Sequence, residues 1–203
     1  MHGKKIVRSG YNKIAPRYAA TRVGDSEDVN LLNLLVERLP KRAMVLDAGC
    51  GSGYPVSQFL AEHFQVTGVD FAEEQIRLAR TNLPDSAFVS AHIAKMPFKN
   101  DVFDALCSYY AIIHVPRHEH WKLLMDLHRI LKPGGLALLC LGPGDLPEDT
   151  ASWLGTEMFW SHYDMQTNLK MLKESGFSTV WSKLVTDPID PLATHLFVLG
   201  KKV

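Results

Sequence analysis

The sequence predicts an α/β protein built on a mostly parallel sheet with helices on both faces. Short unbroken apolar runs alternate with segments whose apolar residues recur at helical spacing. Unbroken apolar strands are typical of parallel sheets that are buried on both faces. The last two predicted strands have no helical pattern between them, which indicates an antiparallel strand at the end of the sheet. The length of 203 residues suits one domain.

The first half of the chain alternates three predicted helices with three predicted strands. Pro40 and Pro84 end the first and third helices, because proline does not continue a helix interior. The predicted elements are a helix over 29–39, a strand over 43–46, a helix over 56–64, a strand over 66–69, a helix over 72–83 and a strand over 87–89.

The second half begins with a strand over 102–107 and a helix whose buried stripe is Leu124, Leu127 and Leu131. A turn over 132–135 precedes a continuous apolar strand over 136–141. The antiparallel pair is expected over 177–185 and 194–199. Two tryptophans, Trp121 and Trp181, fall within these patterns and are expected in the core.

The composition argues against several classes of partner. Lys plus Arg is 22 and Asp plus Glu is 22, so the basic excess of a nucleic-acid-binding protein is missing. No stretch has the apolar length of a membrane span, and no signal-peptide core follows the first residues, so we expect a cytoplasmic protein. The three cysteines have no metal-like spacing, and the run from His118 to His120 suits a solvated helix start, so no metal is expected.

A glycine-rich segment after the first strand is the sharpest local signal. Gly49, Gly51 and Gly53 allow the backbone to turn tightly and to approach a ligand. The segment joins a predicted strand to a predicted helix, the place where doubly wound folds bind ligands. Tyr54 follows the third glycine, so the G-x-G-x-x-G spacing of a dinucleotide site fails.

Two carboxylates flank this segment at strand ends. Asp47 precedes the loop, where it would repel a pyrophosphate and suits a cationic amine. Asp70 ends the second strand, where it can accept hydrogen bonds from both hydroxyls of a ribose or cap the helix that follows. Together they favour S-adenosylmethionine over a nicotinamide dinucleotide.

At these motifs the chain resembles the S-adenosylmethionine-dependent methyltransferases of the Rossmann-like, class I superfamily, of the small-molecule, ubiquinone-biosynthesis-like type. The resemblance runs from about Tyr11 to the end, and the stretch from Tyr11 to Tyr18 is similar to the segment that closes over the cofactor in that family. Further matches are Gly68–Phe71, Met96–Phe98 with Phe103 and Asp104, His114–Pro116, and Arg129–Gly135.

The resemblance implies a doubly wound seven-stranded sheet with an antiparallel last strand. It also implies in-line transfer of a methyl group from S-adenosylmethionine to a small-molecule acceptor, which leaves S-adenosylhomocysteine. We expect a single domain over 1–203, with 1–40 as an N-terminal helical cap and 142–163 as a substrate-side loop or insertion. The oligomeric state stays open.

With the strand-end positions, the resemblance also places individual residues. The catalytic candidates are His114 and His162. The cofactor-binding candidates are Tyr11, Tyr18, Asp47, Gly49, Cys50, Gly51, Gly53, Asp70, Phe71, Gln75, His92, Ile93 and Ser108. The substrate-binding candidates are Tyr109, Tyr110, Trp153, Trp160 and Tyr163. The aromatic residues of 142–163 are expected to wall a pocket, with a small satellite core as the alternative.

One position departs from the family pattern, and two other functions remain open. Family members often carry an acid before the Pro-Phe pair, where it accepts from the adenine amino group, and here His92 stands in that stretch. A neutral His92 could accept through one ring nitrogen, or backbone and apolar contacts could hold the base. A nicotinamide-dependent oxidoreductase and a non-catalytic cofactor-binding homologue are the alternatives.

Overall fold

The computed structural model describes residues 2–203 and places seven strands in one sheet, in the order β3-β2-β1-β4-β5-β9-β8. The first five strands along the chain are parallel, and β9 runs antiparallel between β5 and β8. The predicted fold class is therefore confirmed. The strands are β1 (Met44–Ala48), β2 (Gln65–Asp70), β3 (Ala87–Ser90), β4 (Phe103–Ser108), β5 (Leu131–Leu141), β8 (Phe177–Thr186) and β9 (Thr194–Lys202).

Helices cover both faces of the sheet, which explains the unbroken apolar strands. Neighbouring residues of β1 show this, since Val45 packs into one core cluster and Leu46 into the other. The helices are α2 (Glu27–Asn30), α3 (Asn33–Val36), α4 (Val56–Ala61), α5 (Glu73–Asn82), α6 (His120–Ile130) and α7 (Met165–Glu174), with short 3₁₀ turns η1 (Ile112–His114) and η2 (Arg117–Glu119).

Three details differ from the predictions. The helix expected over 29–39 is two short helices, α2 and α3, joined by hydrogen bonds from residue i to residue i−3. This tighter winding suits the burial of Val29, Leu32 and Leu35, which are spaced three residues apart. Leu131 starts β5 instead of ending α6, since Pro133 favours extended backbone before it. Trp121 lies on the outer face of α6 and is 43% exposed.

The segment 142–163 is not a loop but a hairpin of β6 (Leu146–Trp153) and β7 (Thr156–His162). A two-residue turn joins the strands, and Leu154 and Gly155 both have positive φ, 49° and 78°. This is the turn that matches the twist of a hairpin. Because β6 is polar and mostly exposed, it lacks the apolar–polar alternation by which half-buried strands are predicted.

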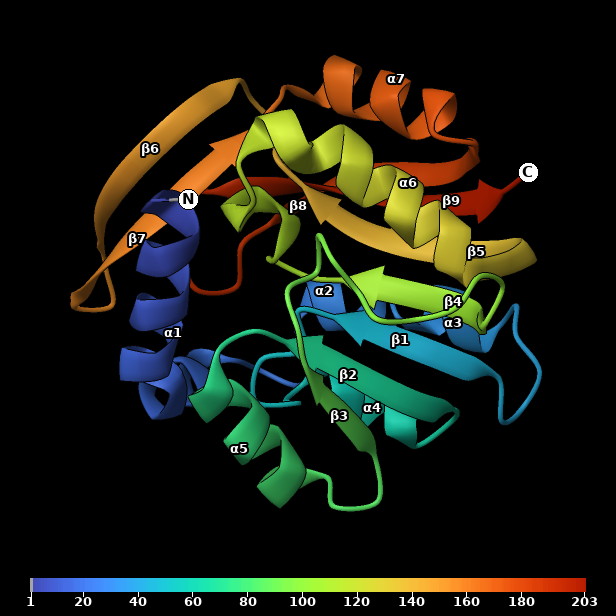
Figure 1. Ribbon diagram of the computed structural model, residues 1–203, viewed down its shortest axis with the longest axis horizontal. Coiled ribbons are helices and arrows are strands. Elements are labelled where there is room, and N and C mark those ends of the chain that lie inside the picture. The colour runs from blue at the N-terminus through green and yellow to red at the C-terminus, as the bar shows by residue number, and fades with distance from the viewer. Residues whose placement is uncertain (1) are drawn as a thin grey trace.

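The long helix α1 (His2–Thr21) packs on β7. A side chain at Gly3 or Gly10 would collide with Phe159 or Met158, so these glycines let the helix approach the hairpin closely. Figure 1 shows α1 and the hairpin together at the edge of the sheet to which the arrowheads of β1, β2 and β4 point. Ligands bind at this edge in doubly wound folds. Within residues 2–203, no helix has the length and apolarity that crossing a membrane requires.

Candidate functional site

The glycine-rich loop leaves β1 and closes against β2. The backbone N–H groups of Gly49 and Cys50 both donate to the carbonyl of Val69, at 2.7 and 2.9 Å. Gly49 has a φ of 91°, and a Cβ there would overlap the Cβ of Ala111. Only glycine fits this position without strain. The loop therefore brings bare backbone to the carboxyl edge of the sheet.

Asp70 joins this loop to the following helix. Its Oδ2 accepts from the N–H of Gly51 at 3.1 Å, and its Oδ1 accepts from the N–H of Ala72 at 2.9 Å. Burial raises the pKa of Asp70 to about 6, against the lowering effect of these backbone donors. Each oxygen keeps a free lone pair, so the carboxylate can fix the loop and still accept hydrogen bonds from a ligand.

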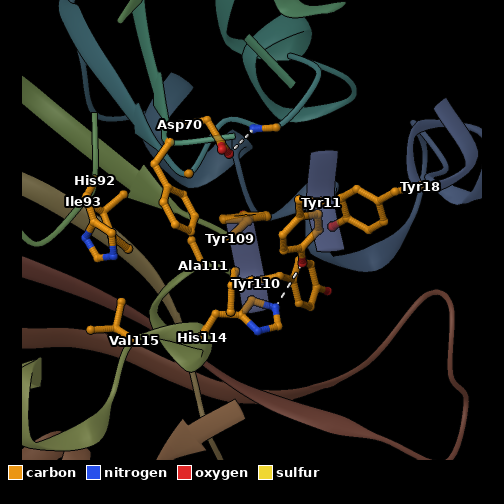
Figure 2. A pocket seen from close by; sticks show the side chains of 14 residues that line it. Tyr11, Tyr18, Asp70, His92, Ile93, Tyr109, Tyr110, Ala111, His114 and Val115 are labelled. Carbon is orange, nitrogen blue, oxygen red and sulfur yellow. Dashed lines mark hydrogen bonds between the residues drawn. The ribbon is translucent and has the colours of Figure 1, made fainter. Parts of the chain in front are cut away.

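A cavity of about 530 Å³, which includes space open to solvent, lies over the loop. Figure 2 shows Asp70 at one end of it and His114 at the other, with His92 and Ile93 on one side and Tyr11 and Tyr18 on the other. Its lining residues are Val7, Tyr11, Tyr18, Gly49, Gly51, Asp70, Phe71, His92, Ile93, Tyr109, Tyr110, Ala111, His114 and Val115.

His92 faces the cavity as a hydrogen-bond donor, which differs from the acceptor role that was one of the two alternatives considered for it. The backbone N–H of Ala94 donates to its Nδ1 at 3.0 Å, so Nδ1 is unprotonated. Burial lowers the pKa of His92, which keeps the ring neutral and places the proton on Nε2. The imidazole can therefore donate to a base but cannot accept from an amino group. The edge of the ring packs on Phe71, at 4.9 Å between ring centroids.

Asp47 is buried beneath the loop. Ser57 donates its hydroxyl hydrogen to Oδ2 at 2.6 Å, and burial raises the pKa of Asp47 to about 6. The carboxylate lines a second, smaller cavity of about 340 Å³, together with Cys50 and Arg22. This cavity shares Tyr18, Gly49, Gly51, Tyr109 and Tyr110 with the larger one, so the two adjoin.

A third cavity, of about 700 Å³, lies on the other side of Tyr11 and His114. Two tryptophans of the hairpin, Trp153 and Trp160, form part of its wall. Their neighbours Met158 and Phe159 are buried in a small cluster with α1, and both tryptophans also pack against this cluster. Both alternatives considered for the aromatic cluster therefore occur side by side, a small core and a pocket wall.

Tyr110 forms part of the wall of all three cavities. Its φ is 54°, a conformation that residues other than glycine rarely adopt. Its hydroxyl donates to Asp28 at 3.0 Å, and the guanidinium of Arg22 lies 4.8 Å from its ring centroid. Backbone strain of this kind persists where the surroundings fix it, and it clusters at functional sites.

Sequence reasoning missed the charged residues of these cavities, which include Arg22, Asp187 and His195. Arg22 is buried and pairs with Asp28 at 2.8 Å. Asp187 pairs with His195 at 2.9 Å. Burial by itself lowers the pKa of His195, but the hydrogen bond to Asp187 opposes it and helps to raise this pKa to about 10. Arg22 lies within the predicted N-terminal cap over 1–40, four positions after Tyr18. The Asp187–His195 pair depends on how the β8–β9 turn folds back, and no local pattern indicates it.

Several predicted site residues lie away from the three cavities. Ser108 donates to the carbonyl of Ala48 between strand ends, and the buried amide of Gln75 has no hydrogen-bond partner among the described residues. The chain turns away from the cavities where β7 ends. As a result, Nδ1 of His162 forms a hydrogen bond with the carbonyl oxygen of Gly144, and Tyr163 stacks on Arg117. Gly53, with a φ of 80°, shapes the loop. Within residues 2–203, no group of His, Cys, Asp and Glu is arranged to hold a metal ion.

The comparisons with known proteins reported below all find methyltransferases. A family model described as a methyltransferase domain matches residues 45–135. A malonyl-[acyl-carrier protein] O-methyltransferase of Pseudescherichia vulneris is 30% identical over 152 residues, which cover 74% of this chain and 59% of that protein. A tRNA (carboxymethyluridine(34)-5-O)-methyltransferase of Arabidopsis thaliana is 28% identical over 149 residues, which cover 73% of this chain and 35% of that protein.

Among solved structures, the fold is similar to that of the 1,6-didemethyltoxoflavin-N1-methyltransferase of Burkholderia thailandensis. The TM-score is 0.76 at 21% identity, and the match covers 98% of this chain and 88% of that one. At this identity the likeness shows the fold. The chain spans less than two thirds of the length of the first curated relatives that it matches, between 30% and 59%.

Proposed function

Since the chain belongs to the class I, Rossmann-like superfamily of S-adenosylmethionine-dependent methyltransferases, we propose that it transfers the methyl group of S-adenosylmethionine to a small-molecule acceptor. One observation carries the proposal. A cavity with the carboxylate of Asp70 at one end meets a second cavity at the other, and Tyr11, Tyr18, Tyr110 and His114 line both.

The residues of the first two cavities suit the parts of this cofactor. Asp70 would accept from the ribose hydroxyls, while Phe71, His92 and Ile93 would enclose the adenine, with His92 as a donor to a ring nitrogen. In the smaller cavity, Asp47 would face the ammonium group and Arg22 the carboxylate. The residues present therefore fit the cofactor, and opposite charges meet in a largely buried site.

S-adenosylmethionine supplies a methyl group that is already activated on a sulfonium, so the protein mainly positions and desolvates the reactants. We propose that α1 and the hairpin exclude water from the cavities. Lys4 on α1 pairs with Glu119 of η2 at 2.6 Å, and Arg8 pairs with Glu73 at the start of α5. These ion pairs hold the helix across the carboxyl edge of the sheet.

The acceptor is proposed to be a small molecule rather than a nucleic acid. The formal net charge is zero, and α1 lines the cavity over the glycine-rich loop with Val7, Tyr11 and Tyr18 rather than with basic side chains. The free, buried cysteines suit a cytoplasmic, reducing compartment. The nicotinamide alternative is disfavoured, because a buried carboxylate, Asp47, lies where a pyrophosphate would bind.

S-adenosylhomocysteine is expected to raise the melting temperature, and NADH is expected to leave it unchanged. A ligand that binds only the native state, at a hundredfold excess over its Kd, adds roughly 2.7 kcal/mol to the free energy of unfolding. A thermal-shift series with both ligands checks this. A shift with NADH and none with S-adenosylhomocysteine would overturn the proposed function.

Asp70→Ala is expected to weaken S-adenosylhomocysteine binding by about tenfold or more, because hydrogen bonds to a charged group contribute roughly 1.5–3 kcal/mol. Titration calorimetry measures the change, and circular dichroism checks the fold. Asp85→Ala is the control, since Asp85 is exposed on the loop before β3. Equal affinities for the two folded variants would contradict the ribose role.

A further inference from the structure

The cavity over the glycine-rich loop, here called the cofactor cavity, adjoins the cavity beside Trp153 and Trp160, here called the aromatic cavity. Their boundary carries a pair of side chains with a fixed hydrogen-bond direction. The ring of His114 lies between the carbonyl oxygen of Phe159, 2.6 Å from Nδ1, and the hydroxyl of Tyr11, 2.9 Å from Nε2. Figure 2 shows the bond between Tyr11 and His114 as a dashed line at the bottom of the cavity. Both residues line both cavities.

The direction of this pair follows from the chemistry of its members. A carbonyl oxygen only accepts, so Nδ1 of His114 must carry a proton and donate to Phe159. Burial lowers the pKa of His114 to about 4, so the ring is neutral and its Nε2 is an acceptor. The Tyr11 hydroxyl therefore donates its single hydrogen to His114. Its oxygen is left able only to accept from a ligand.

The surrounding walls define the shape of that ligand. Trp153 packs against Tyr11 and Tyr18, with ring centroids 6.1 and 5.4 Å apart. Trp160 lies 5.7 Å from the ring of His114 on the same side. Rigid aromatic walls on this side favour a flat aromatic ligand through offset and edge-to-face contacts. Charged side chains, Arg22, Asp187 and His195, form another part of the same cavity wall. The Tyr11 oxygen then lies where such a ligand meets the cofactor cavity.

Building on the proposed function, we infer that the methyl acceptor is a planar aromatic compound whose nucleophilic atom carries a hydrogen, a hydroxyl oxygen or a ring N–H nitrogen, and that Tyr11 accepts this hydrogen. A carbon nucleophile or a thioether offers no such donor and does not suit the site. In this arrangement the Tyr11 oxygen contacts the acceptor directly. His114 is a positioning residue, because it orients the Tyr11 hydroxyl.

The proton movement balances along this pair. The nucleophile forms a bond to the methyl carbon, and the electron pair of the methyl–sulfur bond stays on sulfur. The hydrogen of the nucleophile passes to the Tyr11 oxygen as the Tyr11 hydrogen passes to Nε2 of His114. Because the pKa of His114 is low, the ring does not retain the proton, which leaves through the partly open cavity that His114 lines. No further reactant is required.

Matched probes test the inference without the natural acceptor. Binding of indole is compared with 1-methylindole, and binding of 2-naphthol with 2-methoxynaphthalene, by calorimetry on the protein saturated with S-adenosylhomocysteine. In at least one pair the hydrogen-bearing probe is expected to bind about tenfold more tightly than its methylated partner. Tyr11→Phe is expected to bring this ratio close to one, whereas Tyr163→Phe, the same chemical change at a tyrosine outside the three cavities, is expected to keep it.

The outcomes separate this inference from the proposed function. Failure of S-adenosylhomocysteine to bind overturns the proposed function itself. If it binds, a ratio near one in the wild type, no binding of any probe, or a ratio that persists in Tyr11→Phe overturns the acceptor class, because steric exclusion of the methyl group would survive that change. His114→Leu gives a second measurement, since it frees the Tyr11 hydroxyl to rotate and is also expected to lower the ratio.

Discussion

Gly49→Ala is expected to lower the free energy of unfolding by about 2–5 kcal/mol. Two costs add at this position. A φ of 91° penalises an L side chain, and the new methyl group would overlap the Cβ of Ala111. The first cost is of order 1–2 kcal/mol, and overpacking adds about 1–3 kcal/mol. Chemical denaturation of the ligand-free protein measures the sum.

Gly144→Ala is the matched control. Gly144 lies in the turn between β5 and β6, and a Cβ there would meet nothing within 4 Å. This change is expected to leave the free energy of unfolding within about 0.5 kcal/mol of the wild type, as for other surface substitutions. Equal stability of the two variants would show that the loop relaxes around an added side chain.

The central sheet could be predicted because its strands are buried on both faces and its helices carry regular apolar stripes. Val45 and Leu46 both mark a strand, although they face opposite clusters. The hairpin could not be predicted in the same way. Residues of β6 are mostly exposed, and its partner β7 is held by packing on α1, which lies far away in the sequence. Such an element depends on tertiary contacts and not on local pattern.

Some features of the candidate site could likewise be predicted from the sequence, and others could not. Gly49 and Asp70 lie at ends of predicted strands, so their positions at the carboxyl edge follow from parallel pairing. The polarity of His92 depends on one backbone N–H, that of Ala94, and sequence alone cannot show which ring nitrogen it occupies. The Tyr11–His114 contact joins residues 103 positions apart and requires α1 to fold over the sheet.

Asp47→Asn is expected to stabilise the ligand-free protein at neutral pH by up to about 3 kcal/mol. Burial raises the pKa of Asp47 from 3.8 to about 6, so the native state binds more protons than the unfolded state between these values. The free energy of unfolding therefore falls as pH rises from about 4 to 6, and the wild type carries this loss at pH 7. The neutral amide removes the loss, and its oxygen can still accept from Ser57.

Asp104→Asn is the control of opposite sign. Burial raises the pKa of Asp104, but hydrogen bonds from Lys132 and the N–H of Met44 outweigh it, and the net pKa is lowered. This carboxylate stabilises the fold above its unfolded pKa, so its variant is expected to lose stability at pH 7. Denaturation at pH 4.5 and 7 compares the two, with S-adenosylhomocysteine affinity measured alongside. A gain in stability for Asp47→Asn together with weaker binding would show that the buried charge serves the ligand's ammonium group. A loss of stability at pH 7 would contradict this and show that the ionised carboxylate supports the fold itself.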